Sequence, residues 1–158
     1  MMTDTVHMPP QSGLVPHYQR LHGLAERIPM SLLQLLARAG IAVVFWRSAQ
    51  TKLANWDLTV ALFRDEYRVP VLPPELAAPI ATAFELACPV LLVLGLATRL
   101  ATLPLIGMTL VIQIFVYPTS WPDHLIWTAL LLSILARGPG ALSLDHGIAR
   151  LFAQGRSA

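Results

Sequence analysis

Long apolar stretches alternate with short polar links along most of the chain. After a polar opening segment the apolar stretches cover residues 29–49, 76–98, 100–117 and 121–136. A helix needs about 20 residues, with a range of about 17–25, to cross the apolar layer of a bilayer, so three stretches are long enough and the last is marginal. Helices of soluble proteins carry a polar face opposite their core stripe, and the segments VLLVLGLA and IWTALLLSIL have none. The pattern predicts an all-α integral membrane four-helix bundle with up-down topology.

The links between the stretches complete this organisation. Residues 1–28 are predicted to form a polar N-terminal arm, residues 29–146 the transmembrane domain, and residues 147–158 a C-terminal tail. The long first link contains WDLTVALFRDEY, whose apolar positions fit a short amphipathic helix. Such a helix would lie on the membrane surface as a lid over the mouth of the bundle. A solvated loop with one helical turn is the alternative.

The placement of cations predicts the orientation. With both termini in the cytoplasm, more Lys and Arg residues fall inside than outside, and the link between the last two stretches has none. Because cytoplasmic loops carry the excess of positive charge, we expect both termini in the cytoplasm and the first link on the outer side. The chain would cross the membrane several times.

Composition narrows the class of protein further. The chain has 158 residues, of which 55% are hydrophobic and 13% are charged, whereas a soluble domain is about 45–50% apolar and about 25% charged. This excludes a disordered chain, a nucleic-acid-binding module and an ordinary soluble enzyme. Ten of the eleven cations are arginine, and they lie between apolar stretches rather than in one patch. Cys88 is the single cysteine, so no internal disulfide can form.

Two ionisable residues interrupt the apolar stretches. Arg38 lies near the middle of the first stretch and Glu85 near the middle of the second. A charge at membrane depth costs about 2.5–3.5 kcal/mol on insertion scales, so each needs a partner or a role. If both helices are centred in the bilayer, the two residues differ in depth by about 5 Å, and we expect an ion pair. The pair could be structural and fix the helix register, or form a functional polar centre that binds a proton or a polar ligand head.

A second group of polar and aromatic residues gathers at the predicted outer ends of the helices. This group would form a polar, aromatic-rimmed mouth that receives a quinone head, a thiol or an oxyanion. An ordinary interfacial belt of aromatic and basic residues is the alternative. The members are Arg47, Lys52, Gln113, Tyr117, Trp121 and His124.

Cofactor signals in the sequence are weak. A haem held by two histidines within the bundle would need a pair, but only His124 lies near an apolar stretch. The other histidines are in the arms, at spacings that match no metal-ligand pair on a helix. The glycine-rich segment Gly138-Pro139-Gly140 has no lysine after it and follows a helix, so it is no phosphate loop. We therefore assign no catalytic residue, no metal site and no intrinsic cofactor, and retain quinone as an external one.

Three segments resemble the DoxX family of small bacterial four-helix membrane proteins. They are FWRSAQTKL at 45–53, ELACPVLLVLGLATRLAT at 85–102 and HLIWTALLLSILARGPGALSLD at 124–145. The resemblance implies an integral inner-membrane protein. Some family members are linked to sulfur oxidation, as a subunit of a thiosulfate:quinone oxidoreductase, and others occur beside oxidative-stress or metal-stress proteins.

Three functions remain in competition at this point. The first is a non-catalytic membrane partner in a redox, sulfur or metal/oxidative-stress system, and the second is a quinone- or thiol-handling subunit of a membrane oxidoreductase. The third is a small transporter centred on Arg38 and Glu85. The expected partners are membrane lipid and another protein, and nucleic acid is not among them. Whether the chain has enzymatic activity stays open, with a non-enzymatic role on its own favoured.

Overall fold

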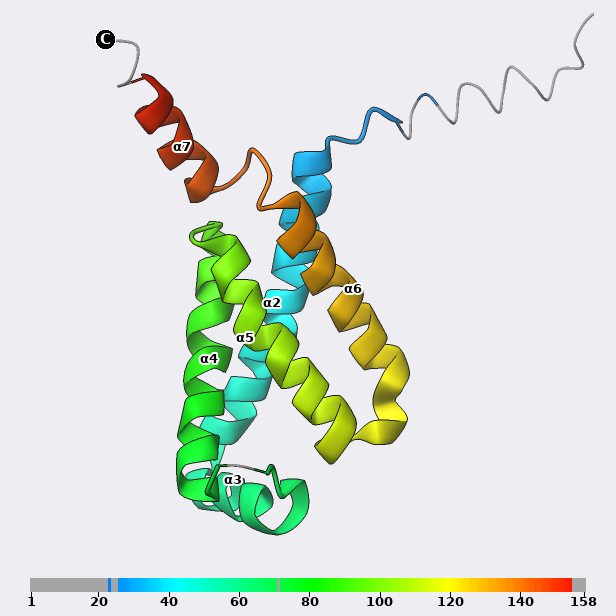
Figure 1. Ribbon diagram of the computed structural model, residues 1–158, viewed down its shortest axis with the longest axis vertical. Coiled ribbons are helices and arrows are strands. Elements are labelled where there is room, and N and C mark those ends of the chain that lie inside the picture. The colour runs from blue at the N-terminus through cyan, green and yellow to red at the C-terminus, as the bar shows by residue number, and fades with distance from the viewer. Residues whose placement is uncertain (1–22, 24–25, 71, 155–158) are drawn as a thin grey trace, which may run out of the picture.

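The computed structural model describes residues 23, 26–70 and 72–154, which fold into helices and connecting turns with no β-strand among them. Four longer helices make up the bundle (Figure 1): α2 (Met30–Ala54), α4 (Pro74–Leu94), α5 (Thr98–Val111) and α6 (Trp121–Arg137). Shorter elements connect them and follow them: α3 (Trp56–Leu62), η1 (Phe63–Tyr67), η2 (Ile112–Val116), η3 (Pro118–Ser120) and α7 (Leu144–Gln154). The predicted all-α class is confirmed.

Three of these helices are long and apolar enough to cross a membrane. They are α2, α4, and α5 with its continuation η2, which together run over Thr98–Val116. Helix α6 has 17 residues. It is shorter than α2 and α4, and also shorter than α5 taken together with its continuation η2. The predicted membrane character is thus supported by three spans, whereas the count of four spans and the side on which the termini lie stay predictions.

Helix α2 packs against both α4 and α6, and helix α5 packs against the same two helices. The four helices therefore form a ring in which each contacts two neighbours. Figure 1 shows α4 and α5 joined closely at one end and diverging toward the other. We call the end where α4 and α5 meet the α7 end, and the opposite end the α3 end. The shared core consists of Ile41, Ala42, Phe45, Cys88, Leu92, Ala101, Leu105, Leu131 and Ile134.

A tight turn joins α4 to α5 at the α7 end. Gly95 ends α4 with φ of 68°, a left-handed conformation that glycine adopts without steric cost. Its N–H bonds to the carbonyl of Leu92 at 3.1 Å, and the N–H of Leu96 bonds to that of Leu91 at 3.0 Å. This pattern satisfies the last carbonyls of α4 and lets α5 begin at Thr98, directly after the turn.

Two segment boundaries differ from the sequence-based expectation. Helix α2 continues to Ala54, because no helix-breaking residue follows position 49. The predicted C-terminal tail contains most of α7, which begins at Leu144. Its apolar residues recur at helical spacing, and this short amphipathic pattern escaped the search for long apolar stretches. The predicted N-terminal arm lies mostly outside the described residues.

Candidate functional site

A cavity of about 710 Å³ opens between α2, α4 and α5 in the half of the bundle nearest α3. Most of its wall is apolar. The lining includes Ile80 and Phe84 from α4, and Pro104, Gly107 and Met108 from α5. Phe84 and Ile80 are also about 40% exposed on the outer surface. The cavity therefore reaches the lipid-facing side of the bundle between α4 and α5.

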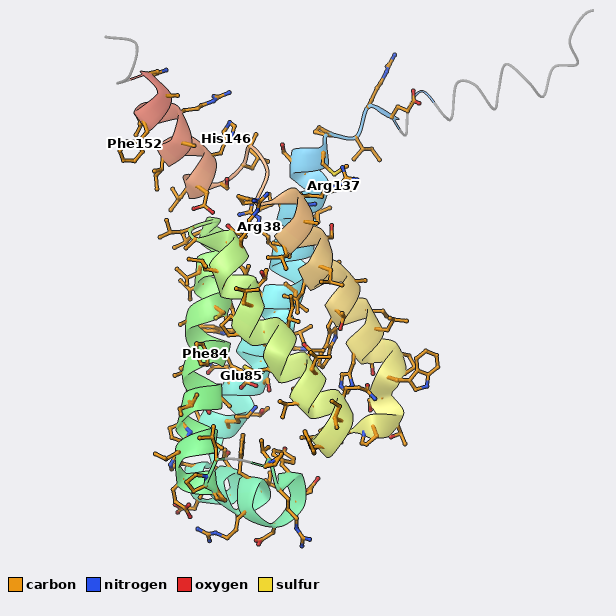
Figure 2. All side chains as sticks on the ribbon, viewed as in Figure 1. Arg38, Phe84, Glu85, Arg137, His146 and Phe152 are labelled. Carbon is orange, nitrogen blue, oxygen red and sulfur yellow. The ribbon has the colours of Figure 1, made fainter. Side chains whose placement is uncertain are left out.

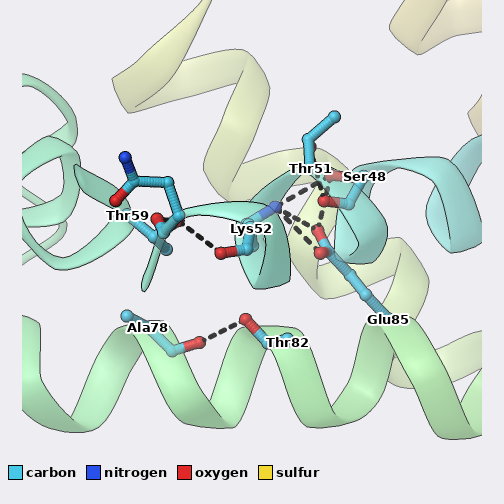
Figure 3. Close-up of polar contacts among 8 residues, drawn as sticks. Ser48, Thr51, Lys52, Thr59, Ala78, Thr82 and Glu85 are labelled. Carbon is cyan, nitrogen blue, oxygen red and sulfur yellow. Dashed lines mark hydrogen bonds and ion pairs between the residues drawn. The ribbon is translucent and has the colours of Figure 1, made fainter. Parts of the chain in front are cut away.

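A buried charge pair stands in the wall of this cavity. Lys52 donates hydrogen bonds to both carboxylate oxygens of Glu85, at 2.9 and 2.8 Å (Figure 3). Ser48 donates to the same carboxylate at 3.0 Å and accepts from Lys52 at 2.8 Å. Ser48 and Lys52 lie four residues apart on α2 and so share one helix face. The side chain of Glu85 is 1% exposed and that of Lys52 16%, so the pair is largely removed from solvent.

A second polar group enters the cavity from α6. His124 lines the cavity and is 4% exposed. Its Nδ1 lies 2.6 Å from Oε1 of Gln113 in η2. The Nε2 of Gln113 donates in turn to the carbonyl of Pro118 at 2.9 Å. The ring of Trp127, one turn along α6, packs edge-on against His124 with ring centroids 5.0 Å apart. These contacts hold the imidazole in one orientation.

The segment after α3 covers the α3 end of the cavity. Phe63 and Tyr67 of η1 both line it, and their rings make an edge contact with centroids 5.2 Å apart. Tyr67 also packs against Tyr117, at 6.1 Å between centroids. Burial, together with a hydrogen bond to Tyr117, raises the pKa of Tyr67 above its ordinary value. The first link thus contains the predicted amphipathic helix, and the turn that follows it covers the cavity mouth.

The predicted outer mouth corresponds in large part to this cavity. Arg47, Lys52, Tyr117 and His124 line it. Gln113 does not line it but forms a hydrogen bond with His124, which does. Trp121 is 60% exposed and lies outside it.

Sequence reasoning missed three residues that line this cavity. It named neither Ser48 nor Tyr67, and it assigned Glu85 to a different group, with Arg38. The position of Ser48, four residues before Lys52, was an available signal. The position of Tyr67 beside the bundle was not, because it depends on how the first link folds back.

The predicted ion pair between Arg38 and Glu85 is not formed. Glu85 binds Lys52 instead, whereas Arg38 donates hydrogen bonds to the carbonyls of Leu92 and Leu142. Figure 2 shows Arg38 near the α7 end and Glu85 well down α4. Ser48, at the level of Glu85, follows Arg38 by ten residues on α2, which corresponds to about 15 Å of helix. The prediction failed because α2 projects past the α4–α5 turn, so the two helices are not centred at the same level.

Arg38 belongs to a separate cluster at the α7 end. Asp145 accepts hydrogen bonds from the N–H groups of Ala97 and Thr98, at 2.8 and 3.0 Å, and from the Thr98 hydroxyl at 3.0 Å. Burial alone would raise the pKa of Asp145. The hydrogen bonds from Thr98 and Ala97, with the nearby charge of Arg38, outweigh burial and hold that pKa below its ordinary value. Arg38 and Asp145 thereby fasten the last link to the α4–α5 turn.

Metal ligands do not gather in the part of the chain that the structure describes. No group of three or more His, Cys, Asp or Glu side chains is close enough there to hold a metal ion. Cys88 is a buried core residue.

Comparison with known proteins agrees with the resemblance seen in the sequence. No curated protein and no solved structure matches the chain. The model of the DoxX family matches residues 33–118, from the first turn of α2 to η3. The match covers most of the elements that line the cavity, with the exception of α6. Because it spans more than half of the 158 residues, the chain belongs to the DoxX family.

Proposed function

We propose that the protein is an inner-membrane subunit that binds a quinone in the cavity and presents it to a redox partner protein. The observation that carries this proposal is the cavity itself, with an apolar wall that reaches the lipid side and polar groups at one end. Ligand sites in proteins typically enclose about 300–1,000 Å³. A volume of about 710 Å³ lies within that range.

The cavity is large and partly open, so a ligand, lipid chains or water can enter it.

The lining favours a ligand with an apolar tail and a polar ring. Ile80, Phe84 and Met108 offer a surface for the tail next to the lipid. Arg47 and Tyr117 place hydrogen-bond donors, and His124 a ring nitrogen, around the polar end. A quinone has an isoprenoid tail and a ring with two opposed oxygens, and it diffuses within the membrane. It matches this arrangement better than a water-soluble thiol or oxyanion does.

We place the exchange of electrons on a partner protein that meets the quinone bound in the cavity. The protein would then be a non-enzymatic member of a redox, sulfur or metal/oxidative-stress system. We further propose that α6 is a short fourth span, that both termini are cytoplasmic, and that the cavity opens in the periplasmic half of the membrane. The hypothesis of a transporter centred on Arg38 and Glu85 is no longer supported, because these two residues lie in different clusters.

Two glycines provide a matched test. Gly107 lines the cavity, Gly40 lies on the outer face of α2, and an added Cβ would meet no atom within 4 Å at either position. Gly107→Phe should fill the cavity and weaken binding of a decyl-substituted benzoquinone at least about tenfold, which equals about 1.4 kcal/mol. Gly40→Phe should leave binding as in the wild type. The measurement is a titration of detergent-solubilised protein, followed by quenching of tryptophan fluorescence.

Mass spectrometry of the protein purified in mild detergent complements the titration. A quinone that copurifies with the wild type and is lost from Gly107→Phe would support the proposal. Equal binding by both glycine variants, or no binding by the wild type, would refute it.

A further inference from the structure

We infer that His124 presents an unprotonated Nε2 to the cavity and therefore selects a ligand head that carries a hydroxyl group. Within the proposed function, on which this inference rests, the selected form is the hydroquinone rather than the quinone. Three features of the site support it: the hydrogen-bond chain behind His124, the accessibility of its second nitrogen, and the hydrogen bonds that already occupy Lys52.

The chain of hydrogen bonds fixes which imidazole nitrogen carries the proton. The carbonyl of Pro118 can only accept, so the side-chain group of Gln113 that faces it at 2.9 Å must be the NH₂. The amide oxygen of Gln113 then faces Nδ1 of His124 at 2.6 Å. An amide oxygen can only accept as well, so Nδ1 must carry a hydrogen. In the neutral imidazole this leaves Nε2 as an acceptor.

The acceptor nitrogen is free to meet a ligand. Within the described part of the chain Nε2 of His124 has no hydrogen-bond partner, although the residue is 96% buried, with 4% exposure, and lines the cavity. The contact with Trp127 and the bond to Gln113 prevent the ring from turning to another partner. Nε2 of His124 is not among the fully buried polar atoms that lack a partner, so a donor that enters the cavity can approach it. A ligand that donates at this point gains a hydrogen bond.

A quinone carbonyl has no hydrogen to give, whereas a hydroquinone hydroxyl does. At His124 the two forms of one ligand therefore differ by a hydrogen bond that only the reduced form makes. Lys52 does not reverse this preference, because its three contacts, with Ser48 and both oxygens of Glu85, occupy the three N–H donors of its ammonium group. The cavity should thus bind the hydroquinone more tightly than the quinone.

The tautomer is tested directly by ¹⁵N NMR of the full chain in detergent with labelled histidine. His124→Phe identifies the signals of His124. We expect the wild type to show a protonated Nδ1 and an unprotonated Nε2. Gln113→Leu removes the acceptor behind Nδ1 and should shift the proton toward Nε2, a spectroscopic change that a merely structural role of Gln113 would not produce. A protonated Nε2 in the neutral wild-type imidazole would overturn the inference.

The selectivity is tested with a decyl-substituted benzoquinone and its hydroquinone, titrated anaerobically into the same samples. The wild type should bind the hydroquinone about three- to tenfold more tightly, the range that one hydrogen bond supplies. In His124→Phe and Gln113→Leu the ratio of the two affinities should fall toward one. Equal affinities in the wild type would overturn the inference and leave the proposed function standing. Failure of the wild type to bind either form would refute the proposed function, and this inference with it.

Discussion

The buried pair of Lys52 and Glu85 allows the sharpest test of the structure. Replacing Lys52 with methionine leaves a carboxylate that is 1% exposed without its counter-charge, in a wall that is largely apolar. Breaking a buried ion pair by removing one partner typically costs about 3–5 kcal/mol. Ser48 remains as a hydrogen-bond donor to Glu85, and water can enter the partly open cavity, so we expect the lower part of that range.

The opposite change should be milder. In Glu85→Gln the unpaired group is Lys52, whose side chain is 16% exposed and lies two residues before the end of α2. A lysine in that position can extend its ammonium group toward the membrane surface and regain water. We expect a loss of about 1–2 kcal/mol, in line with a hydrogen bond to a charged group that has been weakened rather than removed. The double change Lys52→Met with Glu85→Leu should recover most of the stability.

The assay is a double-mutant cycle on unfolding free energy, measured by SDS titration in mixed micelles. Two further cycles serve as controls. Arg64 and Glu75 form an ion pair in which both side chains are 57% exposed, and this pair should show only weak coupling because solvent screens the two charges. Arg38 and Glu85 lie in separate clusters, so their effects should add within about 0.5 kcal/mol.

The three cycles should give different coupling energies. We expect a coupling of at least about 1.5 kcal/mol for Lys52 and Glu85, within the range of residues that share one network. Additive effects at this pair would show that the two side chains do not meet. A large coupling between Arg38 and Glu85 would restore the register expected from the sequence and refute the one observed.

Three further predictions follow from the α7 end and the first link. Gly95→Ala should destabilise the protein by more than about 2 kcal/mol, because the left-handed conformation disfavours alanine and the added Cβ would meet Arg38 and Ser143; the midpoint of thermal unfolding in detergent measures this. Asp145→Asn should lower that midpoint at pH 7, and the gap to the wild type should close below about pH 4, since a group whose pKa is depressed by folding loses its contribution as pH falls. A cysteine replacing the exposed Asp57 should react with an impermeant maleimide in intact cells, while the buried Cys88 stays unlabelled; no labelling would contradict a periplasmic first link.

The helices of this protein could be predicted because their signals are local. The apolar stretches at 76–98 and 121–136 end within a few residues of α4 and α6. Gly95 and Gly138 stop the helices at the positions where both have positive φ. Length, hydropathy and breaker residues all act within one helix, and a single sequence contains all of them.

The relation between helices was not local and was predicted wrongly. Centring each stretch in a bilayer placed Arg38 beside Glu85, but Arg38 contacts the carbonyls of Leu92 and Leu142. The segment that joins α6 to α7 and the start of α7 contact both helices at this end: Asp145 accepts from the N–H of Thr98 at the start of α5, and the carbonyl of Leu142 accepts from Arg38 of α2. The segments that suggested the family, GLATR and GPG with SLD, meet there in space. Their shared role is therefore to hold the bundle together at the α7 end, away from the cavity.

The cavity depends on a feature that hydrophobic periodicity does not report. Both η1 and η2 are π-helical turns, closed by the bonds from Arg68 N–H to Phe63 O and from Tyr117 N–H to Ile112 O. Each π turn contains an extra residue and rotates the following side chains relative to an α-helix, and such turns are frequent at functional sites. Here η2 contains Gln113, which orients His124. Tyr67 is the last residue of η1, Tyr117 directly follows η2, and the rings of these two tyrosines meet across the mouth. A pattern with a period of 3.6 residues places these side chains on the wrong helix face.

Restoring α-helical geometry by deleting one residue of η2 should therefore separate Gln113 from His124 and abolish ligand binding, while the apolar stretch still inserts into the membrane.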